Sequence, residues 1–184
     1  MDTGALYRAV ALNLWRWGGD PSSEFEAVRA CDDIGSNLDD PELRSEPVSK
    51  IASKISAYPA VRDALLRRQR TFAAQPGGAV LDGRDIGTVI APEADVKLFV
   101  TASLEVRAQR RVRELLERGM PAHYDDVLLD LRARDLRDMS RDASPLAQAP
   151  DAVTLDTSEL TIEEAIEMAM RLAEEKLEVS GPRE

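Results

Sequence analysis

Apolar residues recur at helical spacing along much of the chain, so that several segments have one apolar face and one polar face. In the first of these segments Leu6, Val10 and Leu14 share a face, and the two glycines that follow Trp17 can end the helix. Residues 21–47 are polar and show little periodicity, and we predict mostly loop there with one short helix. The spacing predicts helices over 5–17, 24–31, 48–57, 59–72, 104–118, 124–137 and 162–178.

Short apolar runs interrupt this helical pattern in three places. Each run is too short for a helix, is rich in β-branched residues and is followed by polar turn residues, which is typical of buried strands in a parallel sheet. Helices lie between and after these runs, and this alternation predicts an α/β fold with right-handed crossovers. The runs cover residues 78–81, 96–100 and 152–155.

Composition and charge narrow the classes of function. A chain of 184 residues with 43% apolar residues suits one domain with a real core. The net charge of −10 argues against a general nucleic-acid binder, which usually carries a basic surplus. The arginines are nevertheless clustered, which is compatible with a pocket for a small anion. The sequence has one cysteine, Cys31, and one histidine, His123. These counts exclude an intrachain disulfide, a zinc site made of several cysteines and a metal site made of several histidines.

The sequence contains no signal for secretion or membrane insertion. The first residues lack the basic start and the apolar run of a signal peptide. No stretch approaches the ~18 apolar residues that a membrane span needs. We therefore expect a cytoplasmic protein that has no membrane partner.

Two charged segments are candidates for chemistry. The turn 82–85 (Asp-Gly-Arg-Asp) follows the first apolar run, at the strand end where α/β sheets bind ligands. Its guanidinium suits phosphate oxygens, although a polar turn with a local ion pair explains it equally well.

Residues 132–142 hold four arginines and three aspartates. Three interpretations of this segment are open. It could be a solvated helix with internal ion pairs, or a mobile arm that closes on phosphates. It could also be the docking helix of a protein that is not an enzyme. Arg8 and Arg62, on other predicted helices, favour a phosphate pocket.

Taken together, these segments resemble the bacterial cytidylate kinase family, in the same order and over nearly the whole chain. The matching segments are 2–8, 43–49, 53–62, 65–70, 82–89 and 134–141. The resemblance implies the fold of a P-loop nucleoside monophosphate kinase, which has three α/β/α layers around a parallel sheet. It implies a single domain over 1–184, with a helical monophosphate-binding lobe at about 20–75 and a short lid at about 119–145.

The resemblance also implies an activity, the transfer of the γ-phosphoryl group of ATP to CMP or dCMP. Mg²⁺ would be held mainly by ATP and water, without a metal site made of protein side chains. The implied partners are small nucleotides and no nucleic-acid polymer, and we expect a monomer.

Individual roles follow from the same resemblance. Arg8 and Arg84 would hold the CMP phosphate, while Ser53, Arg62 and Asp85 would read the cytosine. The residues implied to bind substrate are Thr3, Tyr7, Arg8, Ser53, Arg62, Arg84, Asp85, Arg134, Asp138 and Arg141. Those implied to act in catalysis are Arg84, Arg137 and Arg141. Those implied to contact ATP are Arg110 and Arg137.

The chain departs from the family in two places. The family has a strand, a glycine-rich phosphate loop and a helix before the segment that matches residues 2–8, whereas no glycine here precedes a lysine. Residues 31–42 are also shorter than the corresponding part of the family. Met1 could be an internal methionine of a longer enzyme, the chain could be a catalytically inactive remnant that only binds CMP, or a second chain could supply the strand. We favour the first explanation, because a remnant would not need the pocket arginines.

Overall fold

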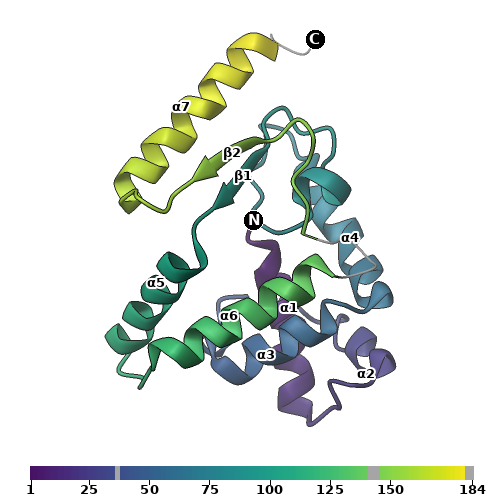
Figure 1. Ribbon diagram of the computed structural model, residues 1–184. Coiled ribbons are helices and arrows are strands. Elements are labelled where there is room, and N and C mark those ends of the chain that lie inside the picture. Colours follow the sequence, from purple (N-terminus) through teal and green to yellow (C-terminus); the bar gives the residue numbers. More distant parts are fainter. Residues whose placement is uncertain (36–37, 141–145, 181–184) are drawn as a thin grey trace. The chain divides into compact units, whose positions relative to one another are not determined.

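The computed structural model describes residues 1–35, 38–140 and 146–180, which divide into two compact units. The first unit comprises residues 1–91, and the second comprises residues 92–140 and 146–180. Figure 1 shows the helices of each unit and the small sheet, which belongs to the second unit.

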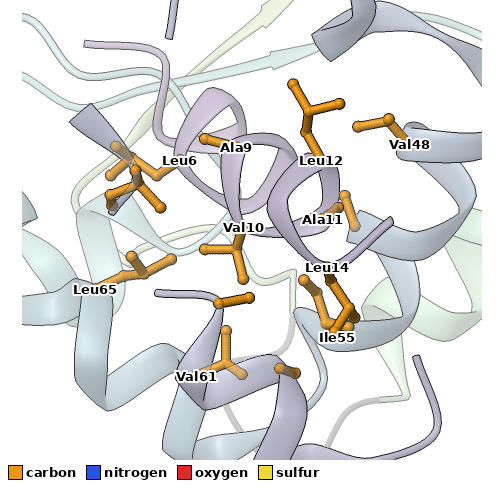
Figure 2. Packing of buried hydrophobic residues seen from close by; sticks show 14 of the residues in the cluster. Leu6, Ala9, Val10, Ala11, Leu12, Leu14, Val48, Ile55, Val61 and Leu65 are labelled. Carbon is orange, nitrogen blue, oxygen red and sulfur yellow. The ribbon is translucent and has the colours of Figure 1, made fainter. Parts of the chain in front are cut away.

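The first unit is built around helix α1 (Thr3–Trp17). Leu6 and Val10 on one side and Ala11 and Leu12 on another are all at most 1% exposed. A helix that is apolar on several sides must be covered by other elements, and Figure 2 shows side chains of two further helices gathered around it. The other elements of this unit are α2 (Glu24–Arg29), the 3₁₀ helix η2 (Pro41–Arg44), α3 (Glu46–Ile55), α4 (Pro59–Ala73) and the π-helical turn η3 (Ile86–Ile90).

Both ends of α1 are capped. The Asp2 carboxylate accepts a hydrogen bond from the Ala5 amide at 3.0 Å and so satisfies one free donor of the first turn. At the other end Gly18 has a φ of 76°, a conformation that glycine adopts without strain. Asp2 thereby fixes where α1 begins, which places Thr3, Tyr7 and the residues after them.

The second unit holds a two-stranded parallel sheet. Its strands pair with Leu98 opposite Val153 and Thr101 opposite Asp156. Parallel strands need a long connection, and two helices lie between them in sequence. The elements of this unit are β1 (Leu98–Thr101), α5 (Leu104–Glu117), α6 (Tyr124–Met139), β2 (Val153–Asp156) and α7 (Ile162–Ser180).

The structure confirms the predicted α/β class, the predicted helices and two of the three strands. The strand predicted over 78–81 is wrong, because this segment forms no ladder and ends in one isolated parallel bridge between Asp82 and Asp2. The helix that starts at Thr3 ends the pairing at once, and Val80 is 84% exposed rather than buried. The three-layer arrangement implied by the resemblance stays a prediction. No helix among the described residues is long and apolar enough to cross a membrane.

Candidate functional site

A buried ion pair joins helix α4 to the turn that follows residue 81. Arg62 in the first turns of α4 donates to the Asp85 carboxylate, and the two side chains are only 11% and 9% exposed. The other terminal nitrogen of Arg62 donates to the Ser56 carbonyl at 3.1 Å. The guanidinium also lies 5.8 Å from the centre of the Tyr7 ring, within the range of a cation–π contact. Three groups therefore hold this one cation in place.

The start of α4 is fixed by its neighbours. Pro59 occupies the first turn, where its missing N–H costs no hydrogen bond. The Tyr58 hydroxyl donates to the Pro21 carbonyl at 3.0 Å, and the Ala60 amide donates to Glu24 at 3.1 Å. Arg62 is thus presented from a helix end that is anchored to two other segments of the same unit.

The turn that presents Asp85 is held against the start of α1. The amide and the hydroxyl of Thr3 both donate to the Asp82 carbonyl, at 2.9 and 2.8 Å. A Cβ at Gly83 would lie 2.2 Å from the Thr3 hydroxyl oxygen, so only glycine fits beneath this contact. The close approach explains why the polar turn contains a glycine at this position.

A π-helical turn, η3, follows Asp85 directly. The amides of Val89 and Ile90 donate to the Asp85 carbonyl at 2.9 and 3.3 Å. Arg70 of α4 donates to the Val89 carbonyl at 3.2 Å and ties this turn to the helix. π-Helical turns are rare in proteins overall, and those that occur are often found at functional sites. Here the turn fixes the backbone of a buried carboxylate.

These elements enclose a cavity of about 100 Å³ in the first unit. The space admits several water molecules or one flat ring, and it is smaller than the clefts that enclose whole drug-sized ligands. Its wall combines an aromatic ring, apolar side chains, a guanidinium, carboxylates and an amide, which suits a heteroaromatic ring with both donors and acceptors. The lining residues are Tyr7, Pro59, Arg62, Asp63, Leu66, Gln69, Asp85 and Val89.

Comparison with known proteins assigns this chain to a family. Residues 1–175 match the family model of cytidylate kinase. The chain belongs to the cytidylate kinase family. The cytidylate kinase of Caulobacter sp. (strain K31) is 50% identical over 175 residues, an alignment that covers 95% of this chain and 81% of that protein. The cytidylate kinase of Xanthobacter autotrophicus (strain ATCC BAA-1158 / Py2) is 53% identical over 176 residues, covering 95% and 84%. By this resemblance the chain is an enzyme.

Among the site residues that the cytidylate kinase resemblance implied, the structure brings Tyr7, Arg62 and Asp85 together in the cavity. Arg8 lies one position further along α1 and pairs with Asp2 at 2.5 Å. Thr3 uses its hydroxyl to hold the turn, as described above. The implied contact of each residue with a nucleotide stays a prediction.

Two other implied residues of the first unit do not line this cavity. Ser53 lies on α3, where its carbonyl accepts a hydrogen bond from the Ser56 hydroxyl at 3.0 Å. Arg84 is half-buried in the turn between Gly83 and Asp85. Their implied contacts with the base and the phosphate stay predictions.

The remaining implied residues of the described chain lie in the second unit. Asp138 on α6 is 2% exposed, and Arg134, one turn earlier, approaches it to 3.9 Å. Arg137 is exposed on the same helix. Arg110 on α5 donates to the carbonyl of Thr157 at 2.6 Å and to that of Leu160 at 3.2 Å, and so braces the turn after β2. Arg141 lies outside the described residues.

Sequence reasoning missed Gln69 as a member of the site. Gln69 falls in the matching segment 65–70, but the resemblance was not used to give it a role, and a single glutamine in a charged helix gives no signal by composition. The spacing could have found it, because Leu66 and Gln69 follow Arg62 by four and seven positions and share its face of the helix. Among the described residues, no group of three or more His, Cys, Asp or Glu side chains could hold a metal ion.

Proposed function

We propose that this chain is a nucleoside monophosphate kinase that transfers the γ-phosphoryl group of ATP to CMP or dCMP, giving CDP or dCDP. The observation that carries the proposal is the cavity in which the buried Arg62–Asp85 pair faces the Tyr7 ring and apolar side chains. Membership of the cytidylate kinase family supports the same conclusion.

The cavity chemistry suits cytosine. The Asp85 carboxylate can only accept hydrogen bonds, and cytosine offers an exocyclic amino group as donor. Arg62 can only donate, and cytosine offers its ring nitrogen and its carbonyl as acceptors. Uracil would turn a carbonyl toward the carboxylate, which leaves two acceptors face to face. We therefore propose that this pair selects cytosine over uracil, with Ser53 contacting the base from α3.

The phosphate of the acceptor nucleotide needs cations outside the cavity. We propose that Arg8 and Arg84 supply them, with Thr3 holding the turn from which Arg84 extends. Arg8 now pairs with Asp2, but these side chains are 22% and 40% exposed, so the pair is accessible to a competing anion. A phosphate group matches the planar fork of arginine and can take the place of the Asp2 carboxylate.

Other residues keep the roles that the family resemblance implies. We propose that Arg134 and Asp138 bind the ribose and phosphates of the acceptor, that Arg110 and Arg137 contact ATP, and that Arg84, Arg137 and Arg141 stabilise the transferring group. Phosphoryl transfer depends on positioning and on neutralising spread negative charge, which arginines do well. We further propose that residues 20–75 form the monophosphate-binding lobe and residues 119–145 the lid.

ATP would bring Mg²⁺ with it. We propose that ATP oxygens and water hold most of the coordination sites of this ion. The ion would neutralise part of the charge on the transferring phosphates.

Calorimetry with CMP and with UMP tests the proposal. We expect CMP to bind at least about ten-fold more tightly than UMP, because a misplaced acceptor leaves buried polar groups unpaired. Asp85→Asn should remove most of this preference, whereas Asp39→Asn, which changes an exposed carboxylate that does not line the cavity, should keep it. No binding heat at millimolar CMP would refute the proposed acceptor site. A coupled assay for ADP release then tests transfer, and CMP-independent ADP release would refute CMP as the acceptor.

A further inference from the structure

Gln69 is buried, and its amide nitrogen lacks a partner. The residue is 1% exposed, and its Nε2 makes no hydrogen bond to any of the described residues. Buried side-chain donors are nearly always satisfied, because an unpaired donor loses its bond to water and gains nothing in return. A group of this kind at a cavity wall indicates a partner that is not part of the protein.

Gln69 lines the same cavity as Arg62 and Asp85. It follows Arg62 by two helical turns on α4, so both side chains lie on one face of the helix. The Arg62 guanidinium is already engaged by the Asp85 carboxylate and the Ser56 carbonyl. The Gln69 amide therefore offers the cavity a neutral donor that no acceptor among the described residues uses.

We propose that Gln69 reads the base: its side-chain amide donates a hydrogen bond to a ring acceptor of the bound pyrimidine. This inference rests on the proposed function and adds a specificity residue to it. Cytosine presents adjacent acceptors, its ring nitrogen and its carbonyl, beside the amino group that faces Asp85. Two of the five Arg62 N–H donors are already used by the Ser56 carbonyl and the Asp85 carboxylate, and Gln69 adds a further donor for the second of the two base acceptors.

The same arrangement predicts a trade-off between stability and binding. In the free chain the unpaired amide is unfavourable, and an apolar side chain of similar size would avoid this penalty. In the complex the base supplies the acceptor. Replacing Gln69 by an apolar residue should consequently leave the free chain as stable or more stable while it weakens the nucleotide complex.

The experiment compares Gln69→Met and Gln69→Leu with the unaltered chain, by calorimetry with CMP and by thermal unfolding without ligand. We expect both variants to bind CMP about ten-fold more weakly and to unfold at the same or a higher temperature. Gln75→Met is the matched control, because Gln75 is exposed just after the same helix and donates to the Gly78 carbonyl. It should change neither quantity.

Two outcomes overturn the inference. A change in CMP affinity of less than about two-fold in both variants would show that the amide does not contact the base, since a lost hydrogen bond should weaken binding more. A lower unfolding temperature in both variants would show that the amide is already satisfied within the free chain. If the unaltered chain itself fails to bind CMP, the proposed function fails instead, so the two failures are distinguishable.

Discussion

The substitution Asp85→Asn would leave the buried Arg62 guanidinium without its carboxylate partner. The two side chains are 11% and 9% exposed, so water can replace the lost partner only in part. Breaking a buried ion pair on one side typically costs about 3–5 kcal/mol. Because Arg62 keeps the Ser56 carbonyl and the Tyr7 ring, we expect the lower end, about 3 kcal/mol of unfolding free energy.

Thermal unfolding followed by circular dichroism measures this effect. For a chain of 184 residues, 1 kcal/mol corresponds to about 2–4 °C in Tm, so the loss should lower Tm by about 6–12 °C. The double variant Arg62→Leu with Asp85→Leu removes both charges and should be more stable than Asp85→Asn, since no uncompensated charge remains. Asp63→Asn is the control, because it neutralises an exposed carboxylate on α4. A loss below about 1 kcal/mol for Asp85→Asn, or a double variant less stable than Asp85→Asn, would refute the reasoning.

Three further effects follow from contacts in the two units. Gly83→Ala places a Cβ 2.2 Å from the Thr3 hydroxyl and should cost about 1–3 kcal/mol of unfolding free energy in denaturant titrations, as over-packing does. Burial raises the pKa of the Cys31 thiol from 9.0 to about 11, so alkylation by iodoacetamide at pH 8 should be about 100-fold slower in the native than in the denatured chain. Asp135→Asn removes the two-pronged bond from Arg107 that joins α6 to α5, and it should cost about 1 kcal/mol because the pair is partly exposed.

Each of these expectations has its own control. Gly35→Ala should be nearly neutral, because the nearest atom to its Cβ belongs to Arg68 at 3.9 Å, and equal losses at both glycines would contradict the steric argument. Equal alkylation rates of the native and denatured chain would contradict the raised thiol pKa. Asp130→Asn, at an exposed position of α6, is the control for Asp135→Asn, and an equal effect of the two would assign the loss to helix charge rather than to the bond with Arg107.

The helices could be predicted from sequence because their apolar spacing is the property that buries them. The residues Leu6, Val10 and Leu14, which indicated the first helix, are each at most 1% exposed in the core. The predicted strand over 78–81 failed for a physical reason: a strand exists only with a partner, and local composition does not reveal whether a partner is present. In the part of the chain that the structure describes, the pairing is limited to one bridge between Asp82 and Asp2, just before α1.

The candidate site could be predicted in part. Arg62 and Asp85 were expected from the resemblance, and the structure adds that they bond to each other and that Arg62 also donates to the Ser56 carbonyl. The structural role of Thr3 against Gly83 could not be read from the chain, because it depends on a close approach between residues far apart in sequence. The spacing places Gln69 on the Arg62 face of α4, but it does not show that the Gln69 amide nitrogen is buried without a partner among the described residues.

The structure of the chain bound to CMP tests the central claim most directly. The account predicts the cytosine ring in the cavity beside Tyr7, with its amino group at hydrogen-bonding distance, about 2.7–3.2 Å, from an Asp85 carboxylate oxygen. A cytosine ring bound elsewhere, with the Arg62–Asp85 cavity empty of the base, would contradict it.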